Sequence, residues 1–467
     1  MAENLLRKLP SVDKLKHTGE AKELLEKYGD NIFVSGTREV LAEIRGEIQS
    51  GNITDVEEEL SEDRILSRVE RFLGAKFTPS LKKAVNATGV ILHTGLGRAV
   101  LPSCAQKAIA DVAKGYSTLA TDVETGKRSH RDVHLDDLLK ELTGAEDATV
   151  VNNNAAATML VLNTLANGKE VILSRGQLVE IGGSFRMPDV MATSGAILKE
   201  VGTTNKTHLR DYLAAVGENS GAIMRVHHSN YRIVGFTSEP SIEELVGLAK
   251  KLNLYIFDDL GSGALVDLKA YGIEHEPLVQ DSIKAGVDVA CFSGDKLIGG
   301  PQAGIIVGKA PIIEKIRKNS LTRAFRVGKL TIAGMEATLR LFLRPETLTE
   351  EHPIYRMFAM REGDVEKRAK TMAKELESKL KKNGDVSVID GGSQVGSGAV
   401  PVETIPTKLI QIVPKDISAE TLGQELRRNN PPIFTRVQKG GVWIDLRTVS
   451  KDEETIVRNA LLRVLAG

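Results

Sequence analysis

Apolar side chains recur at helical spacing through the first 76 residues of the chain. The spacing places them on one face of each of two helices: Val40, Leu41, Ile44 and Ile48 in the first, and Val69, Phe72 and Leu73 in the second. No alternation typical of a strand occurs in this segment. The pattern predicts a small helical domain over residues 1–76.

A different pattern runs from about residue 145 to 320, where short β-rich runs alternate with helical stretches. Seven runs predict strands: 148–151, 170–174, 196–201, 222–227, 254–259, 287–293 and 303–307. Ser241 and Glu244 have the spacing of a capping box, which opens a helix between the fourth and fifth runs. Strands separated by helices predict an α/β fold with an open, mostly parallel, seven-stranded sheet. We place this large domain at residues 77–350 and expect its chemistry just after the strands, outside their carboxyl ends.

A third pattern begins beyond about residue 355. It consists of a long amphipathic helix, a strand at 386–389, a Gly/Ser-rich loop at 391–398, a strand at 409–413, a helix at 418–428 and a strand at 442–446. The order of elements predicts a small α+β domain over residues 351–467.

The composition is that of an ordinary folded protein, and 467 residues correspond to about three domains. The 62 Lys and Arg residues balance the 62 Asp and Glu residues, which argues against a protein that grips polyanions by bulk charge. The two cysteines, Cys104 and Cys291, lack metal-site spacing, which indicates a reducing compartment. No apolar run reaches the roughly 18–20 residues of a membrane span, and the start lacks a secretion signal. We expect a cytoplasmic protein that holds no metal.

The most informative stretch is Ser293-Gly294-Asp295-Lys296, which ends a predicted strand and precedes a glycine-rich turn. The amine of Lys296 can form a Schiff base with an aldehyde cofactor where its surroundings favour the neutral form. The hydroxyl of Ser293 lies one short turn earlier, where it can reach a cofactor phosphate. The alternative is a solvated lysine in a glycine turn.

Two adjacent aspartates, Asp258 and Asp259, end the strand before it. A carboxylate here can keep a pyridine nitrogen protonated, so that the ring withdraws electrons from a substrate carbanion. Because side chains alternate along a strand, only one of the two can face the ring. The alternative for either residue is a turn or helix-cap aspartate.

Asn152, Asn153, Asn154 and Ala155 lie where the first strand of the sheet meets a helix. Small and amide residues at such a junction present backbone N–H groups to a phosphate, although they are also frequent helix caps. Together with one of the two aspartates and with Lys296 they have the composition and order of a pyridoxal 5'-phosphate site.

Three arginines form a further group of candidates. Arg98 follows a Thr-Gly-Leu-Gly turn, whereas Arg323 and Arg326 lie about 30 residues beyond Lys296. Guanidinium groups bind oxyanions through paired hydrogen bonds. Surface ion pairs are the alternative for each of them.

The chain resembles the bacterial selenocysteine synthases, the L-seryl-tRNA(Sec) selenium transferases, in several long strings of residues. The resemblance is carried by residues 5–14 (LLRKLPSVDK), 85–94 (VNATGVILHT), 151–155 (VNNNA), 175–186 (RGQLVEIGGSFR), 201–206 (VGTTNK) and 293–308 (SGDKLIGGPQAGIIVG). It extends over essentially the whole chain, to about Val449.

The resemblance implies a fold-type-I pyridoxal-phosphate enzyme that converts L-seryl-tRNA(Sec) to L-selenocysteinyl-tRNA(Sec) with selenophosphate, through a dehydroalanyl-tRNA intermediate. Lys296 would be the Schiff-base lysine, and Asp259 matches the aspartate that faces the pyridine nitrogen. Arg98, Arg323 and Arg326 match the arginines that hold the selenium donor. The resemblance further implies that the helical first domain binds the tRNA and that the protein assembles as a homodecamer, a pentamer of dimers.

The chain departs from the family pattern near the expected substrate pocket. Gly95 stands where the family commonly has Asn, and Thr118 and Ala120 stand where Asn and Glu are usual. The string 128–131 reads Arg-Ser-His-Arg instead of Arg-Gly-Ser-Arg. These differences concern substrate handling more than cofactor chemistry.

Two rival functions use the same residues. A pyridoxal-phosphate lyase or aminotransferase acting on a small free amino acid would need Lys296 and Asp259 but neither the helical domain nor the arginines. A non-catalytic tRNA-binding scaffold is disfavoured by the intact lysine and aspartate. The residues alone support tRNA binding weakly, because segment 1–76 has 12 Lys and Arg against 16 Asp and Glu and only a small basic cluster, Arg7, Lys8, Lys14 and Lys16.

Overall fold

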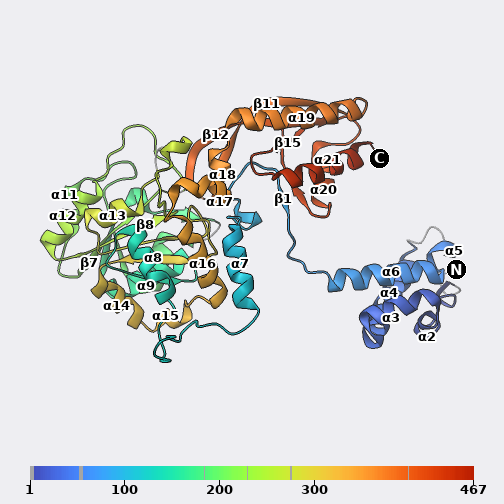
Figure 1. Cartoon of the computed structure of the whole chain (residues 1–467), viewed down its shortest axis with the longest axis horizontal. Coiled ribbons are helices and arrows are strands. Elements are labelled where there is room, and N and C mark those ends of the chain that lie inside the picture. The colour runs from blue at the N-terminus through green and yellow to red at the C-terminus, as the bar shows by residue number, and fades with distance from the viewer. Residues whose placement is uncertain are drawn as a thin grey trace. The chain divides into compact units, whose positions relative to one another are not determined.

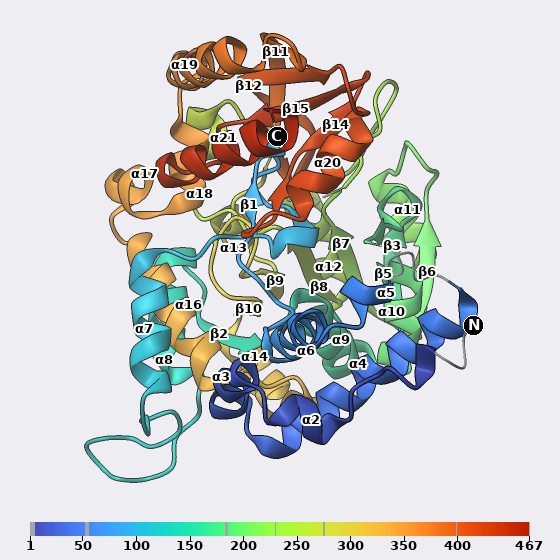
Figure 2. The same ribbon diagram turned by 90° about the vertical axis from the view of Figure 1, so that its right-hand side faces the viewer.

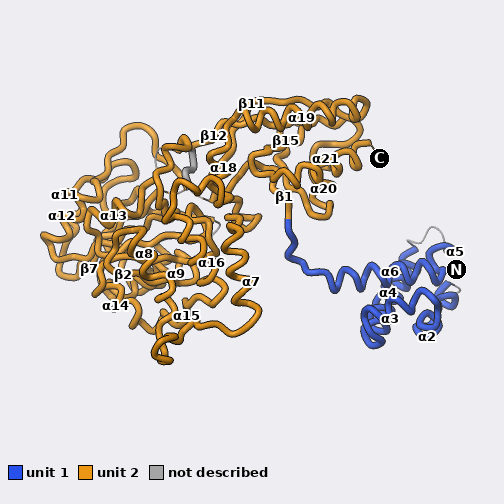
Figure 3. Tube along the Cα trace, in the orientation of Figure 1, with its two compact units in different colours: residues 1–83 blue, residues 84–467 orange. Residues whose placement is uncertain are grey.

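The chain forms two compact units in a computed structural model, Met1–Lys83 and Ala84–Gly467 (Figure 3). The structure describes residues 5–51, 56–182, 185–228, 230–273, 276–397 and 399–466. Within these ranges, no helix is both long enough and apolar enough to cross a bilayer.

The first unit is helical. Its helices are α2 (Val12–Lys16), α3 (Gly19–Tyr28), α4 (Asp30–Ser50), α5 (Val56–Glu59) and α6 (Glu62–Phe77). The apolar faces predicted from the spacing meet in a core of their own, in which Ile44 and Val69 are fully buried. Arg68 of α6 binds Glu47 of α4 through two hydrogen bonds of 2.7 and 2.8 Å, which ties the two long helices together.

The second unit contains the predicted seven-stranded sheet (Figure 1). Its strands, in sheet order, are β2 (Asp147–Val151), β10 (Gly304–Gly308), β9 (Val289–Ser293), β8 (Tyr255–Gly261), β7 (Ser220–Val226), β3 (Glu170–Ser174) and β6 (Ile197–Val201). Neighbouring strands from β9 to β6 are parallel, and β10 is antiparallel to both β2 and β9. All seven predicted strands are therefore confirmed, each within a few residues of its expected bounds.

Helices cover both faces of this sheet. One face packs on α8 (Val133–Thr143), α11 (Leu209–Ala215), α12 (Ile242–Leu252), α13 (Val279–Ala285) and α16 (Lys329–Leu341). The other packs on α9 (Asn154–Ala166), α10 (Met187–Ser194) and α14 (Ala310–Lys318). Residues alternate between the two cores along each strand, so that Ile223 of β7 faces the first group while Met224 faces the second. The predicted capping box is present at the start of α12, with Ser241 and Glu244 bonded to each other's backbone N–H.

Short elements connect these layers. They are η1 (Thr94–Leu96), α7 (Ser103–Ala113), η2 (Arg175–Gln177), the small hairpin of β4 (Glu180–Ile181) and β5 (Phe185–Arg186), η3 (Leu268–Tyr271), α15 (Leu321–Ala324), η4 (Pro345–Thr347), α17 (Leu348–Glu351) and α18 (Pro353–Ala359).

The C-terminal part of the second unit is a four-stranded antiparallel sheet with helices against it (Figure 2). Its elements are α19 (Glu362–Leu380), β11 (Gly384–Gly396), β12 (Ala399–Pro414), α20 (Ala419–Arg427), β14 (Arg436–Gln438), β15 (Gly441–Asp445) and α21 (Lys451–Ala466). A separate short pair joins β1 (Val85–Asn86) to β13 (Ile433–Phe434).

The predicted Gly/Ser-rich loop at 391–398 is wrong over residues 391–396, because these residues belong to strand β11; residue 398 lies outside the described residues. The packing of the neighbouring strand explains why glycines occur in β11. A Cβ at Gly391 would lie 2.4 Å from Leu409 Cδ1, and one at Gly392 would lie 2.8 Å from Thr404 Cβ. Glycine therefore lets the side chains of β12 lie over the neighbouring strand.

Candidate active site

Asp259 lies at the end of β8 on the face covered by α9. It is 5% exposed, and its carboxylate accepts hydrogen bonds from Asn154 Nδ2 (2.8 Å), Thr158 Oγ1 (2.9 Å) and the backbone N–H of Gly261 (3.1 Å). Burial raises the pKa of Asp259, and these three hydrogen bonds oppose the rise. A cation placed against this carboxylate would favour its ionised form.

Asp258 points to the opposite face of the sheet. Its carboxylate accepts a 2.7 Å hydrogen bond from Arg225 Nε and a 2.6 Å hydrogen bond from Ser282 Oγ. The fully buried Asp258 is thus committed to a structural ion pair, whereas Asp259 is turned toward the start of α9. Strand alternation separates their roles, as expected from the sequence.

Lys296 lies in the turn between β9 and β10, three residues after Ser293. The turn closes through hydrogen bonds from Gly294 N to Ala303 O (2.8 Å), Gly299 N to Lys296 O (3.0 Å) and Gly300 N to Gly294 O (2.9 Å). Lys296 is 6% exposed. Burial lowers the pKa of its amine, and the charge of Arg98 acts in the same direction, while Asp259, Asp295 and Glu276 oppose the shift. The site therefore shifts the amine toward its neutral form, which is the nucleophilic one.

The carbonyls that follow Lys296 are held from the first turn of α18. His352 Nε2 is bonded to the carbonyl of Ile298 (2.9 Å), and the Tyr355 hydroxyl donates to the carbonyl of Leu297 (3.1 Å). Both side chains are fully buried. This support fixes the backbone on which the lysine stands.

The junction of β2 and α9 contains the four predicted cradle residues. Asn153 is the N-cap of α9, and its side chain accepts a 2.9 Å hydrogen bond from Ala156 N. Asn152 donates its backbone N–H to Phe325 O (2.8 Å), whereas Asn154 turns its side chain to Asp259. Asn154 therefore positions the carboxylate, and the N-terminus of α9 with Ala155 remains as the part that can receive a phosphate.

The buried polar groups around this carboxylate fit a pyridine-ring cofactor. Among the described residues, Asn154 Oδ1 and Ser262 Oγ are buried without a hydrogen-bond partner, and Ser262 belongs to the turn just after Asp259. Unsatisfied buried polar atoms are costly unless a ligand completes their hydrogen bonds. Asn154 is bonded to Asp259, so a ligand held against this carboxylate would lie within reach of these unpartnered atoms.

The three candidate arginines occupy two places. Arg98, in the left-handed backbone region at φ 62°, donates from Nη1 to Asp295 Oδ2 at 2.7 Å, beside Lys296. Arg326 lines a cavity of about 440 Å³ with Arg128 and Arg131, and its lining also includes Ala120, Ser129 and His130. Burial lowers the pKa of Arg131, and the charges of Arg326, Arg128 and Arg323 add to the effect. The residues that differ from the family pattern at 120 and 128–131 therefore line the same cavity as Arg326. This cavity is strongly cationic.

Sequence reasoning missed two polar partners of the aspartates. Thr158 lies one helical turn after Asn154 on α9, so both side chains reach Asp259 from the same helix. A threonine four residues after an asparagine in an otherwise apolar helix is a signal that the sequence contained. The sequence did not indicate the ion pair between Arg225 and Asp258, because this pair forms only when β7 and β8 are neighbours in the sheet.

The fold is that of the fold-type-I pyridoxal-phosphate enzymes. Solved structures agree on the fold: a D-glucosaminate-6-phosphate ammonia-lyase matches with a TM-score of 0.59 at 18% identity, over 85% of this chain and 99% of that one.

Sequence comparisons identify the family. The L-seryl-tRNA selenium transferase family matches residues 84–450, and the selenocysteine synthase N-terminal family matches residues 6–45. The L-seryl-tRNA(Sec) selenium transferase of Alkaliphilus metalliredigens is 47% identical over 98% of both chains. That of Carboxydothermus hydrogenoformans is 45% identical over 100% of this chain and 99% of its own. The chain belongs to the L-seryl-tRNA selenium transferase family.

Proposed function

We propose that Lys296 and Asp259 bind pyridoxal phosphate and that the chain converts L-seryl-tRNA(Sec) to L-selenocysteinyl-tRNA(Sec) with selenophosphate as the selenium donor. The observation that carries this proposal is the pair of buried groups at the ends of β8 and β9, an amine whose pKa is lowered and an acid held by three donors. The full-length similarity to L-seryl-tRNA(Sec) selenium transferases supports the choice of substrate.

Each residue of this pair has a distinct task. When bound, pyridoxal phosphate supplies an electron sink that stabilises negative charge at the α-carbon of the seryl group. Lys296 would hold the cofactor through its amine and, once the amine of the substrate has displaced it, would accept the α-proton. Asp259 would keep the ring nitrogen protonated, and Asn154 and Thr158 orient its carboxylate. Ser293 and the N-terminus of α9 at Ala155 would bind the cofactor phosphate.

The arginines bind the selenium donor. Selenophosphate is an oxyanion, and Arg98, Arg323 and Arg326 supply guanidinium groups that can bind it. Arg98 is presented next to Lys296 by its ion pair with Asp295, and Arg326 belongs to the cationic cavity. Neutralisation of their charge by the donor offsets the repulsion among the clustered arginines.

Residues 1–76 bind the tRNA in this proposal, which is supported by the match of residues 6–45 to the selenocysteine synthase N-terminal family. Of the small basic cluster, Lys14 forms an ion pair with Glu62 (2.6 Å) and Lys16 forms one with Asp30 (2.5 Å). These exposed pairs contribute little to stability, so the lysines can exchange their partners for phosphates. On the family resemblance we also infer a homodecamer, which a solution mass ten times that of the chain would test.

The direct test incubates the purified protein with pyridoxal phosphate, seryl-tRNA(Sec) and selenophosphate and identifies the amino acid esterified to the tRNA. We expect selenocysteine from the wild type and unchanged serine from Lys296→Ala. Borohydride reduction followed by peptide mapping should place the cofactor adduct on Lys296. An adduct elsewhere, or a Lys296→Ala variant as fast as the wild type, would contradict the proposal.

The same preparation separates this function from that of an enzyme acting on a free amino acid. Free serine and seryl-tRNA are added in turn while the cofactor absorbance is followed. We expect only seryl-tRNA to change the spectrum at micromolar concentration.

A further inference from the structure

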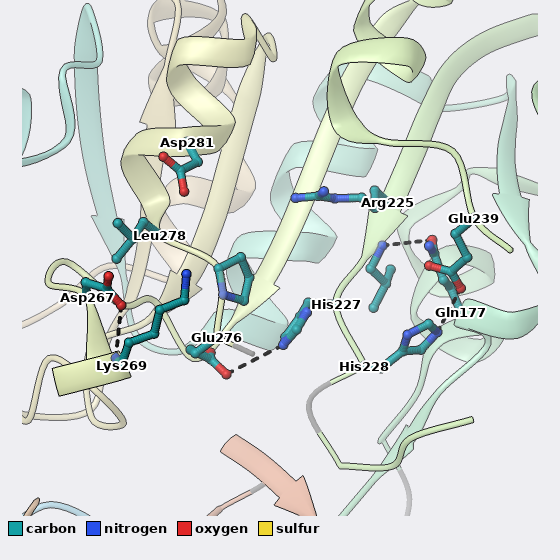
Figure 4. Close-up of a pocket in the computed structure, with 12 residues that line it drawn as sticks. Gln177, Arg225, His227, His228, Glu239, Asp267, Lys269, Glu276, Leu278 and Asp281 are labelled. Carbon is teal, nitrogen blue, oxygen red and sulfur yellow. Dashed lines mark hydrogen bonds and ion pairs between the residues drawn. The ribbon is translucent and has the colours of Figure 1, made fainter. Parts of the chain in front are cut away.

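A second pocket, of about 480 Å³, opens at the carboxyl ends of β7 and β8 (Figure 4). It is lined by side chains from several segments, among them Gln177, His227, His228, Glu239, Lys269 and Glu276. Asp267 and Asp281 also line the pocket, so it has more carboxylates than basic side chains. The guanidinium group of Arg225, which also lines it, is already paired with Asp258. A pocket with this charge disfavours anions and favours ligands that donate hydrogen bonds.

Glu276 is the unusual member of this lining. Its side chain is 1% exposed, yet neither carboxylate oxygen has a hydrogen-bond partner among the residues that the structure describes. His227 Nε2 lies 3.6 Å from Glu276 Oε2, and the two side chains point toward one another in Figure 4. A buried carboxylate without hydrogen bonds is costly, so a ligand that donates to it would bind favourably.

Backbone contacts join Glu276 and His227 to the cofactor site. His227 donates its backbone N–H to the carbonyl of Asp259 at 2.9 Å. Two residues after Glu276, Leu278 pairs with Ala264 beside the Gly-Ser-Gly turn, and the charge of Glu276 acts on the Lys296 amine. Two residues of the pocket lining, His227 and Glu276, therefore lie near the proposed cofactor site.

The chemistry of the substrate decides what such a pocket can hold. The phosphate of the cofactor is anionic, so the carboxylates of this pocket would repel it. The reacting α-carbon is joined to the terminal ribose of the tRNA through the carbonyl carbon and the ester oxygen, three bonds of roughly 1.5 Å each. The ribose must therefore lie next to the reacting atoms, and it carries a free hydroxyl beside the esterified one. Carboxylates are the usual acceptors for ribose hydroxyls in nucleotide sites.

We propose that this pocket binds the terminal nucleoside of the aminoacylated tRNA, with Glu276 accepting a hydrogen bond from the free ribose hydroxyl and His227 placed beside it. The proposal rests on the proposed function and names the part of its substrate that this pocket reads. A site that binds a hydroxyl through a buried charged acceptor rejects the analogue that lacks it, because the acceptor is then left unpaired.

The test is a double-mutant cycle between protein and tRNA. Wild type and Glu276→Gln are each assayed with seryl-tRNA that ends in a normal adenosine or in 2'-deoxyadenosine, which lacks the free hydroxyl. We expect either change alone to lower kcat/KM about tenfold, as for a hydrogen bond to a charged group, and the two together to lower it no further. Effects that multiply would overturn the proposal.

Equilibrium binding supplies a readout that is independent of turnover. The affinity of the cofactor-free protein for the two uncharged tRNAs should follow the same pattern. Glu243→Gln, an exposed acid of α12 outside the pocket, is the matched control and should behave as wild type with both tRNAs. Glu276→Asp retains the charge and should keep part of the discrimination if Glu276→Gln fails to fold.

The other outcomes are separable. Loss of subunit assembly in Glu276→Gln, with equal effects on both tRNAs, would assign the carboxylate to contact with another copy of the chain and overturn the proposal. A wild type that forms no selenocysteine on normal seryl-tRNA would instead contradict the proposed function. Normal turnover of both tRNAs by the wild type would contradict the ribose subsite alone.

Discussion

At the scale of single residues, one step along a strand separates a structural acid from a chemical one. Asp258 and Asp259 are adjacent and both buried, but they lie on opposite faces of the sheet. Asp258 is hydrogen-bonded to Arg225, a permanent cation, whereas the described hydrogen bonds to the Asp259 carboxylate come from neutral donors. Because no described guanidinium group is bonded to its carboxylate, Asp259 is the one of the two that can stabilise a protonated ring.

Substitution of each aspartate should therefore have a different consequence. Asp259→Asn should lower kcat at least about a hundredfold and shift the absorbance of the bound cofactor, while the thermal midpoint changes little. Asp258→Asn should destabilise the fold by about 3–5 kcal/mol because it leaves Arg225 with no charged partner. Spectra and thermal unfolding of the two variants, measured side by side, check this; equal losses of activity at equal stability would contradict it.

Arg98 should control the pH at which Lys296 reacts. Burial and the charge of Arg98 lower the pKa of this amine, so the wild-type protein should react with an aldehyde at lower pH than a free lysine. In Arg98→Gln the cation is lost and Asp295 is released, and both changes raise the pKa of Lys296. The pH profile for imine formation between cofactor-free protein and pyridoxal should therefore move to higher pH. Lys107→Gln, at an exposed ion pair of α7, is the control and should leave the profile unchanged.

At the scale of elements, the position of the lysine depends on a turn and on the helix that supports it. The turn between β9 and β10 is held by His352 and Tyr355 of the segment that opens α18, far along the chain. Gly299 has φ 70°, and a Cβ there would lie 2.2 Å from His352 Cε1. The glycine and the histidine are thus required together, because the imidazole occupies the space of the missing side chain.

This support makes the stability of the second unit sensitive to acid. Burial lowers the pKa of His352 to about 4 from an ordinary 6.5. Between these values the unfolded chain binds a proton that the folded chain does not, so stability is lost as pH falls from 6.5 to 4. The loss from this group is at most about 3 kcal/mol.

His352→Gln tests the origin of this loss. A glutamine amide can donate to the carbonyl of Ile298 and does not titrate, so the variant should show a shallower fall in stability over the same pH range. Chemical unfolding of both proteins at several pH values between 4 and 7 measures the slopes. Parallel curves would show that other groups are responsible.

At the scale of the whole molecule, the chain is divided into a helical unit and an α/β unit, each with its own core. The residues proposed for the cofactor and the selenium donor all belong to the second unit, between Arg98 and Arg326. The first unit contributes none of them. The two units can therefore be separated experimentally without removing the proposed chemistry.

Deletion of residues 1–83 should leave a folded protein that binds pyridoxal phosphate with an unchanged spectrum but no longer binds tRNA(Sec). The boundary follows the compact unit, which ends at Lys83, beyond the end of α6 at Phe77. Cofactor absorbance and filter binding of tRNA measure the two properties on one sample. Retained tRNA affinity would contradict the role proposed for the helical unit.

Much of the fold could be predicted because its determinants are local. Each strand of the large sheet is a short β-rich run with helical stretches on either side, and Ser241 with Glu244 fixes the start of α12. The Gly/Ser-rich stretch at 391–396 was misjudged for the opposite reason. Its glycines are required by Leu409 and Thr404 of the paired strand, and composition alone does not reveal that partner.

The candidate site, too, could be predicted in part from the sequence. Residue types and their order indicated an amine, an acid and a phosphate-binding junction, because each follows a strand that the local pattern predicts. The tertiary structure decided that Asn154 donates to Asp259, that Arg98 pairs with Asp295 beside Lys296, and that the Glu276 side chain is buried near His227 with no hydrogen bond from a described residue. These contacts join segments between about 50 and 200 positions apart, so they depend on strand order and helix packing. The sequence by itself determined which chemical groups the chain carries after each strand, and the fold decided which of them meet, because burial and charge act only between groups that packing has brought together.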